Sequence, residues 1–207
     1  MHFPDPSPFA PIPGTQPTPH AFFIDRWGTL LETPERGYCK SFQDVVFVEG
    51  ALEALFRASQ AGWLIYLIGN EDAVADGRLG HEAWTEIEGG ILAHLGEHGI
   101  RVNKSYAALD PRDGSGKHKG DSVYLLPNTG AFYHAYHVDG VELGRSWVIG
   151  DSTLELVAGW RAGCRLAAVK TGLALSDGIF DVTPELVAED LPRAVLELLL
   201  LENAVKP

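Results

Sequence analysis

The sequence predicts one α/β domain with three layers, in which a parallel β-sheet lies between two layers of helices. The chain has 207 residues, of which 45% are hydrophobic and 21% charged, and chains of this size usually form one hydrophobic core. Short apolar runs alternate along it with longer segments of helical periodicity. The apolar runs are continuous, which is typical of strands buried on both faces of a parallel sheet.

The elements are expected in regular alternation. Continuous apolar runs predict strands, apolar residues at helical spacing predict helices, and Gly62, Gly99 and Gly163 end three of the helices. Pro192 is accepted because the first turn of a helix tolerates proline. In chain order we expect a strand at 21–24, a helix at 50–61, a strand at 63–68, a helix at 81–98, a strand at 104–108, a helix at 130–138, a strand at 147–149, a helix at 155–162, a strand at 165–169 and a helix at 191–201.

The N-terminal segment differs in composition from the rest. Residues 1–19 contain seven of the thirteen prolines and few residues that could pack into a core. Such a composition is typical of an extended arm. We therefore expect a proline-rich arm at 1–19 and one domain at 20–207.

Charge and composition exclude several classes of protein. The net charge of −12 disfavours binding to nucleic acids and anionic membranes. No apolar run approaches the ~20 residues that span a bilayer, and the start of the chain does not resemble a secretory signal. Cys39 and Cys164 are too few for a disulfide framework or a four-thiolate zinc site. We expect reduced thiols and a cytoplasmic location.

Polar residues directly follow three of the predicted strands. These are Asp25, Asn70 and Asp151. In parallel sheets, ligands bind outside the carboxyl ends of the strands. Mg²⁺ prefers carboxylates together with a substrate phosphate. The pair Asp25 and Asp151 is therefore a candidate magnesium site.

Several segments resemble one known family. Phe-Ile-Asp-Arg-Trp-Gly-Thr-Leu at 23–30 resembles the first motif of the haloacid dehalogenase (HAD) superfamily, and in particular of its subfamily IIIA, the heptose-bisphosphate and histidinol-phosphate phosphatases. Further segments resemble that subfamily in the same order along the chain, at 37–38, 49–55, 70–77, 148–155 and 169–172. The resemblance covers about residues 20–200.

The resemblance implies a Rossmann-like fold with a minimal cap and a hydrolase that acts on a small phosphorylated metabolite. By the resemblance, Asp25 is the nucleophile that forms an aspartyl phosphate. Asp25, Asp151 and the backbone carbonyl of Trp27 are the implied Mg²⁺ ligands, and Gly69 and Asn70 belong to the segment that contacts phosphate.

The chain also departs from the family pattern. Trp27 stands where the family has its general acid, and an indole cannot protonate a leaving alkoxide. Gly69 replaces a Thr or Ser hydroxyl, and Glu155 replaces the second acid of the fourth motif. The family's zinc-binding Cys/His segment is missing, so we expect no structural zinc.

The lysine of the third motif can be placed in two ways. One register aligns Pro127 and Gly130 with the motif and puts Leu126 at the lysine position. The other uses Lys117 or Lys119 as the phosphate-binding lysine and requires a ten-residue insertion. We favour the first register.

Three functions remain open. The first is a Mg²⁺-dependent, phosphatase-like hydrolase with Asp25 as nucleophile and Trp27 in place of the acid. A general acid contributes about 10²–10⁴-fold, so substrates with good leaving groups are the least affected by its loss. The second is a catalytically silent domain that binds a ligand or a partner. The third, weaker alternative is cleavage of a C–halogen or C–P bond.

Overall fold

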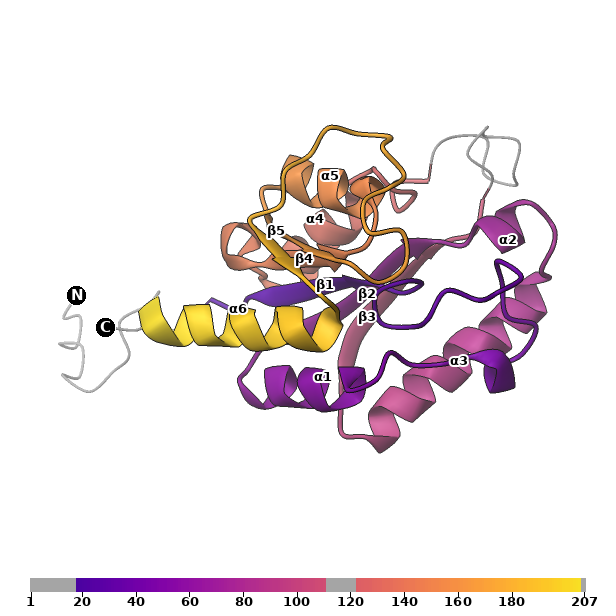
Figure 1. The fold of residues 1–207 in the computed structure, drawn as a ribbon, viewed down its shortest axis with the longest axis horizontal. Helices are drawn as coiled ribbons and strands as arrows, with labels where there is room; N and C mark the ends of the chain where they lie inside the picture. The colour runs from indigo at the N-terminus through magenta and orange to yellow at the C-terminus, as the bar shows by residue number, and fades with distance from the viewer. Residues whose placement is uncertain (1–17, 111–121, 206–207) are drawn as a thin grey trace, which may run out of the picture.

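The computed structural model describes residues 18–110 and 122–205. Its core is a six-stranded sheet in the order β3-β2-β1-β4-β5-β6, and all the pairings are parallel. Figure 1 shows this sheet edge-on with helices on both sides. The predicted arm falls largely on residues 1–17, and Lys117 and Lys119 fall on residues 111–121, so these predictions lie outside the described residues.

The strands and helices alternate along the chain. The strands are β1 (Ala21–Asp25), β2 (Leu64–Asn70), β3 (Val102–Ala108), β4 (Trp147–Gly150), β5 (Arg165–Val169) and β6 (Leu186–Ala188). The α-helices are α1 (Ala51–Gln60), α2 (Asp72–Ala75), α3 (His81–Glu97), α4 (Gly130–Asp139), α5 (Thr153–Ala162) and α6 (Leu191–Val205), and two short 3-10 helices are η1 (Phe42–Asp44) and η2 (Leu143–Arg145).

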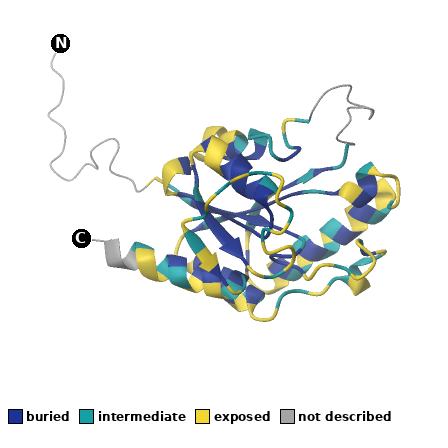
Figure 2. Ribbon diagram, turned by 45° about the horizontal axis from the view of Figure 1, so that its top comes forward, coloured by how far each residue is buried: buried dark blue, intermediate teal, exposed yellow. Residues whose placement is uncertain are grey.

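The sheet has one hydrophobic core on each face. Phe22 and Ile24 of β1 pack on the side of α1, α3 and α6, whereas Ala21 and Phe23 pack on the side of α4 and α5. All of β1 is buried, because successive side chains point to opposite faces and both faces are covered. Figure 2 shows the buried residues concentrated in the sheet and on the inner sides of the helices. The three-layer prediction is confirmed.

The strand order changes direction beside β1, which is the switch point of the sheet. The chain moves outward from β1 to β2 and β3, and then returns to place β4 on the other side of β1. At such a point the connections leave neighbouring strands in opposite directions, which opens a crevice at their carboxyl ends. Between β1 and α1, the described chain contains only η1 as regular structure, which agrees with a minimal cap.

The predicted elements all form, and their ends differ by a few residues. The strand expected at 104–108 begins at Val102, and the helix expected at 155–162 begins at Thr153. The short elements α2, β6, η1 and η2 were not predicted. They have three or four residues each, which is too short for a hydrophobic period to develop.

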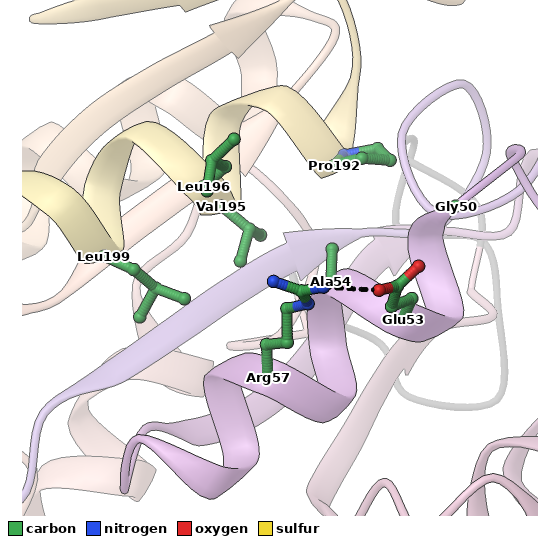
Figure 3. Close-up of a pocket in the computed structure, with 8 residues that line it drawn as sticks. All are labelled: Gly50, Glu53, Ala54, Arg57, Pro192, Val195, Leu196 and Leu199. Atoms are coloured by element: carbon green, nitrogen blue, oxygen red, sulfur yellow. Dashed lines mark hydrogen bonds and ion pairs between the residues drawn. The ribbon is translucent and has the colours of Figure 1, made fainter.

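A shallow groove lies between α1 and α6. It has a volume of about 270 Å³ and is lined by apolar side chains of α6 and by the exposed ion pair Glu53–Arg57 of α1 (Figure 3). This groove is separate from the carboxyl ends of the strands. None of the helices, as far as the chain is described, has the length and apolar character needed to cross a membrane.

Candidate active site

The site lies at the carboxyl ends of β1 and β4. Ile24 of β1 pairs with Ile149 of β4, so Asp25 and Asp151 emerge from two adjacent strands within about one residue of each other. The continuously apolar strands cannot accept a charge in their interior, so the first carboxylates occur where each strand ends. The spacing of 126 residues in sequence becomes a contact in space for this reason.

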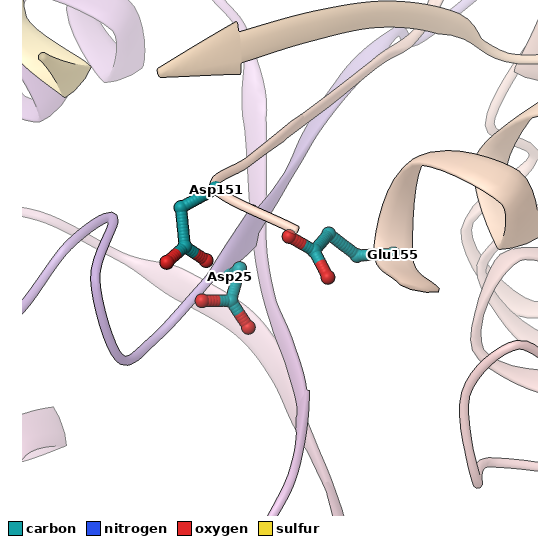
Figure 4. A group of neighbouring side chains, drawn as sticks. All are labelled: Asp25, Asp151 and Glu155. Atoms are coloured by element: carbon teal, nitrogen blue, oxygen red, sulfur yellow. The ribbon is translucent and has the colours of Figure 1, made fainter. Parts of the chain in front are cut away.

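Three carboxylates meet there. One side-chain oxygen from each of Asp25, Asp151 and Glu155 lies within 4.8 Å of the others. Their carboxylates face one another from the end of β1, the end of β4 and the first turn of α5 (Figure 4). The exposed fractions are 9% for Asp25, 4% for Asp151 and 3% for Glu155. Water therefore screens the repulsion between these carboxylates poorly.

Burial and mutual repulsion raise the pKa of all three carboxyl groups. Burial raises the pKa of Asp25 well above its ordinary value, and the charges of Glu155 and Asp151 raise it further. Burial raises the pKa of Glu155 to about 7, with a further contribution from Asp151. Burial likewise raises the pKa of Asp151 to about 6, although a backbone hydrogen bond from Leu173 opposes the shift. A bound cation removes this penalty, so the donor set fits a divalent metal ion.

Backbone groups hold the Asp151 side chain in place. The N–H of Leu173 donates to Oδ2 of Asp151 at 2.7 Å. Gly28 and Gly172 both have positive φ, and a Cβ on either would lie within 2.2 Å of the same oxygen. Only glycine lets the turn after β1 and the turn after β5 approach the carboxylate this closely.

Glu155 is fixed by the start of α5. Ser152 caps this helix, and its backbone N–H and hydroxyl both donate to the Glu155 carboxylate in a capping box. Asp177 accepts from the backbone N–H of Thr153 at 3.0 Å and from its hydroxyl at 2.6 Å. The first turn of α5 therefore attracts two carboxylates, as expected for a helix N-terminus.

A hydrogen bond to the buried ion pair of Arg26 and Glu71 holds the Trp27 side chain in place. Its indole Nε1 donates to Oε2 of Glu71 at 3.0 Å, and Nε of Arg26 donates to Oε1 of the same carboxylate at 2.7 Å. Arg26 is fully buried and also donates to the carbonyls of Gly69 and Tyr106. Burial raises the pKa of the Glu71 carboxyl, and the guanidinium and the indole N–H counteract that shift. Arg26 thus ties the ends of three strands together and orients Trp27.

Gly69 and Asn70, at the end of β2, have distinct surroundings. Gly69 has a φ of +151°, and a Cβ there would lie 3.1 Å from Oδ1 of Asp25 and 3.3 Å from Nη2 of Arg26. A side chain at this position would therefore press against the Asp25 carboxylate and the buried guanidinium. The Asn70 amide exchanges two hydrogen bonds with the backbone of Leu126, at 2.9 and 3.2 Å.

Two cavities meet at Trp27. The carboxylate cavity, of about 270 Å³, is lined by Asp25, Asp151 and Glu155, and also by Leu126. Leu126 lines the same cavity as Asp25, whereas Lys117 and Lys119 lie outside the described residues, so the register of the third motif stays a prediction. The second cavity, of about 190 Å³, is called the aromatic cavity here; its described lining is Trp27, Gly37, Tyr38, Cys39, Asn70, Glu71, Asp72, Ala73, Leu79, Trp84 and Ile87. Trp27, Asn70 and Asp72 line both.

The structure brings Asp25, Trp27, Asn70 and Asp151 together as expected. Sequence reasoning missed Glu71 as the partner of Trp27 and Arg26. A charged residue directly after the buried strand β2 was the available signal. Asp177 carried no signal, since it lies in an irregular segment and reaches α5 only through the tertiary fold.

Comparisons with known proteins show which proteins the chain resembles. A family model described as HAD-hydrolase-like matches residues 126–194. A D-glycero-beta-D-manno-heptose-1,7-bisphosphate 7-phosphatase of Haemophilus influenzae is 25% identical over 182 residues, which are 86% of this chain and 97% of that protein. The enzyme of that name from Mesorhizobium japonicum is 29% identical over 167 residues, 76% of each chain.

Solved structures show the same architecture. A D,D-heptose 1,7-bisphosphate phosphatase from B. bronchiseptica, complexed with magnesium and phosphate, superimposes with a TM-score of 0.74 at 24% identity, over 87% of this chain and 98% of that one. A putative HAD-like phosphatase from Mesorhizobium loti gives 0.70 at 26% identity, over 88% of both chains. The fold is thus of the HAD type, and the chain is similar to the heptose bisphosphate phosphatases of the HAD superfamily, as its motifs predict.

Proposed function

We propose that the chain is a Mg²⁺-dependent phosphatase that acts on a small phosphorylated metabolite, with Asp25 as nucleophile. The observation that carries the proposal is the meeting of Asp25, Asp151 and Glu155 oxygens within 4.8 Å at the switch point of the sheet. The similarity to heptose-bisphosphate phosphatases supports a phosphorylated sugar as one substrate class to test.

The cluster fits a magnesium ion on chemical grounds. Mg²⁺ binds carboxylate oxygens, and buried carboxylates that repel one another gain most from a cation. Asp25, Asp151 and the backbone carbonyl of Trp27 would hold the ion, with Glu155 supporting it through Asp151. Bound there, Mg²⁺ would supply positive charge that offsets the charge of the phosphate.

Asp25 acts on the phosphorus atom. One of its carboxylate oxygens forms a bond to phosphorus, and the bond between phosphorus and the leaving oxygen breaks. Water then attacks the aspartyl phosphate, which releases inorganic phosphate and regenerates the Asp25 carboxylate. Trp27 cannot donate a proton to the leaving oxygen, and its indole N–H is engaged by Glu71 at 3.0 Å.

The test is hydrolysis of acetyl phosphate, 4-nitrophenyl phosphate and a panel of sugar phosphates that includes heptose bisphosphate. We expect turnover with Mg²⁺, no turnover with a chelator, and loss of turnover in Asp25→Asn. Glu53→Gln is the matched control, because this carboxylate is exposed on α1, where it pairs with Arg57. Turnover by Asp25→Asn at the wild-type rate contradicts the proposal.

A catalytically silent domain is the second candidate. Trp27 in place of the acid favours it, and so does Leu126 at the lysine position of the favoured register, because both replace polar groups that the family uses. If no substrate in the panel is turned over, a ligand should still raise the melting temperature without being consumed. The assembled carboxylates favour both candidates over C–halogen cleavage, for which release of halide from 2-haloacids is the test.

A further inference from the structure

The aromatic cavity adjoins the carboxylate cavity across a single wall. Trp27, Asn70 and Asp72 line both. A substrate whose phosphorus lies next to Asp25 therefore has the aromatic cavity as a neighbouring space for the rest of the molecule. Trp27 stands at the border, at the place where the family has the group that serves the leaving oxygen.

The walls of the aromatic cavity combine aromatic and aliphatic side chains with the polar side chains of Asn70, Glu71 and Asp72. Three aromatic side chains contribute, from Trp27, Tyr38 and Trp84, together with Leu79 and Ile87. The volume of about 190 Å³ is sufficient for one ring, since an engineered apolar cavity of about 150 Å³ binds benzene.

The chemistry of the leaving group points the same way. The indole N–H of Trp27 is used by Glu71, so Trp27 gives no proton to the leaving oxygen. A phenolate, with a pKa of about 10, leaves without protonation far more readily than an alkoxide. A leaving group with an aromatic hydroxyl thus fits the cavity, and it can leave without a proton from a general acid.

We infer that the aromatic cavity binds the leaving group of the substrate, and that the substrate is a phosphate ester of an aromatic hydroxyl compound. This inference rests on the proposed function. Asp25 attacks phosphorus, the bond between phosphorus and the aryl oxygen breaks, and the electron pair stays on that oxygen. The phenolate takes its proton from water, and a second water molecule releases inorganic phosphate from Asp25.

The kinetic experiment compares substituted phenyl phosphates with alkyl phosphates and with acetyl phosphate. We expect kcat/KM to be higher for phenyl than for alkyl phosphates, and to fall steeply as the pKa of the leaving phenol rises. Leu79→Trp fills the aromatic cavity and should lower the ratio of kcat/KM for phenyl phosphate over acetyl phosphate roughly tenfold, mainly through KM. Leu196→Trp is the matched control, since Leu196 lines the groove between α1 and α6 and is 41% exposed.

A binding experiment does not depend on turnover. The chain has five tryptophans, and their indole N–H signals can be separated by ¹⁵N NMR and assigned with single Trp→Phe variants. Addition of 4-nitrophenol should shift the signals of Trp84 and Trp27 in the wild type, and shift them less in Leu79→Trp.

Each result decides between the two proposals. A preference for alkyl phosphates, rates independent of leaving-group pKa, an unchanged ratio in Leu79→Trp, or unshifted Trp84 and Trp27 signals would each overturn this inference. Turnover of acetyl phosphate alongside any of these results leaves the proposed function standing. Absence of all turnover refutes the proposed function and this inference with it.

Discussion

Removal of one carboxylate from the cluster, by Glu155→Gln, should stabilise the metal-free protein at high pH. Two like charges 4.8 Å apart repel each other by about 3 kcal/mol at an effective dielectric constant of 20. Glutamine keeps the size of the side chain and an acceptor for the Ser152 N–H, so the capping geometry can persist. The change therefore removes mainly charge.

The sign of the pH dependence follows from the direction of the pKa shift. The pKa of Glu155 is raised by burial and by Asp151 from its ordinary value of 4.5 to about 7. Between these values the native state holds a proton that the unfolded state has lost, so the free energy of unfolding falls as the pH rises. The stabilisation is present below pH 4.5 and is lost above pH 7, and it amounts to roughly 3 kcal/mol.

The assay is urea unfolding with a chelator at several pH values from 4.5 to 8. The wild type should lose on the order of 3 kcal/mol more than Glu155→Gln over this range. Mg²⁺ at pH 8 should restore stability to the wild type and less to the variant. Glu53→Gln, at an exposed pair on α1, should follow the wild type. Parallel pH profiles for the wild type and Glu155→Gln would refute the reasoning.

Three further changes test other parts of the site. Glu71→Gln removes the carboxylate charge that faces the buried guanidinium of Arg26 at 2.7 Å, and urea unfolding should show a loss of about 3–5 kcal/mol; a loss below about 1 kcal/mol would contradict the ion pair. Gly172→Ala would place a Cβ 2.0 Å from a carboxylate oxygen of the cluster and should weaken Mg²⁺ binding in calorimetry. Gly62→Ala, whose Cβ meets nothing within 4 Å at a similarly positive φ, should leave Mg²⁺ binding intact, and equal effects would contradict the packing argument. Trp27→Asp should raise hydrolysis of alkyl phosphates relative to acetyl phosphate, up to ~10²-fold in kcat, and an unchanged ratio would show that more than the acid is missing.

Local sequence was sufficient for the elements with a full hydrophobic period. Residues 81–97 form the expected helix, and Trp84, Ile87, Ile91 and Leu95 form its buried stripe. The four apolar residues of β1 and the aspartate that follows them likewise identify a strand that is buried on both faces and ends at a carboxylate. These features depend on spacing within a few residues, which the sequence records directly.

The sequence also predicted two carboxylates of the site, because the carboxyl ends of parallel strands lie at one edge of the sheet. Asp25 and Asp151 were placed by this rule, and the motifs around them predicted the fold that the comparisons support.

The remaining features depend on contacts between distant segments. Glu71, directly after β2, binds Arg26 and Trp27 after β1, and the Asn70 side chain holds the backbone of Leu126. The aromatic cavity is formed from the turn after β1, the loop before η1, the region of α2 and the buried face of α3. No sequence periodicity predicts this cavity, because each residue that lines it looks like an ordinary core or loop residue within its own segment. The sequence by itself determined which groups stand at the end of the sheet, and only the tertiary structure decided what surrounds them, because burial and charge repulsion arise once the segments pack together.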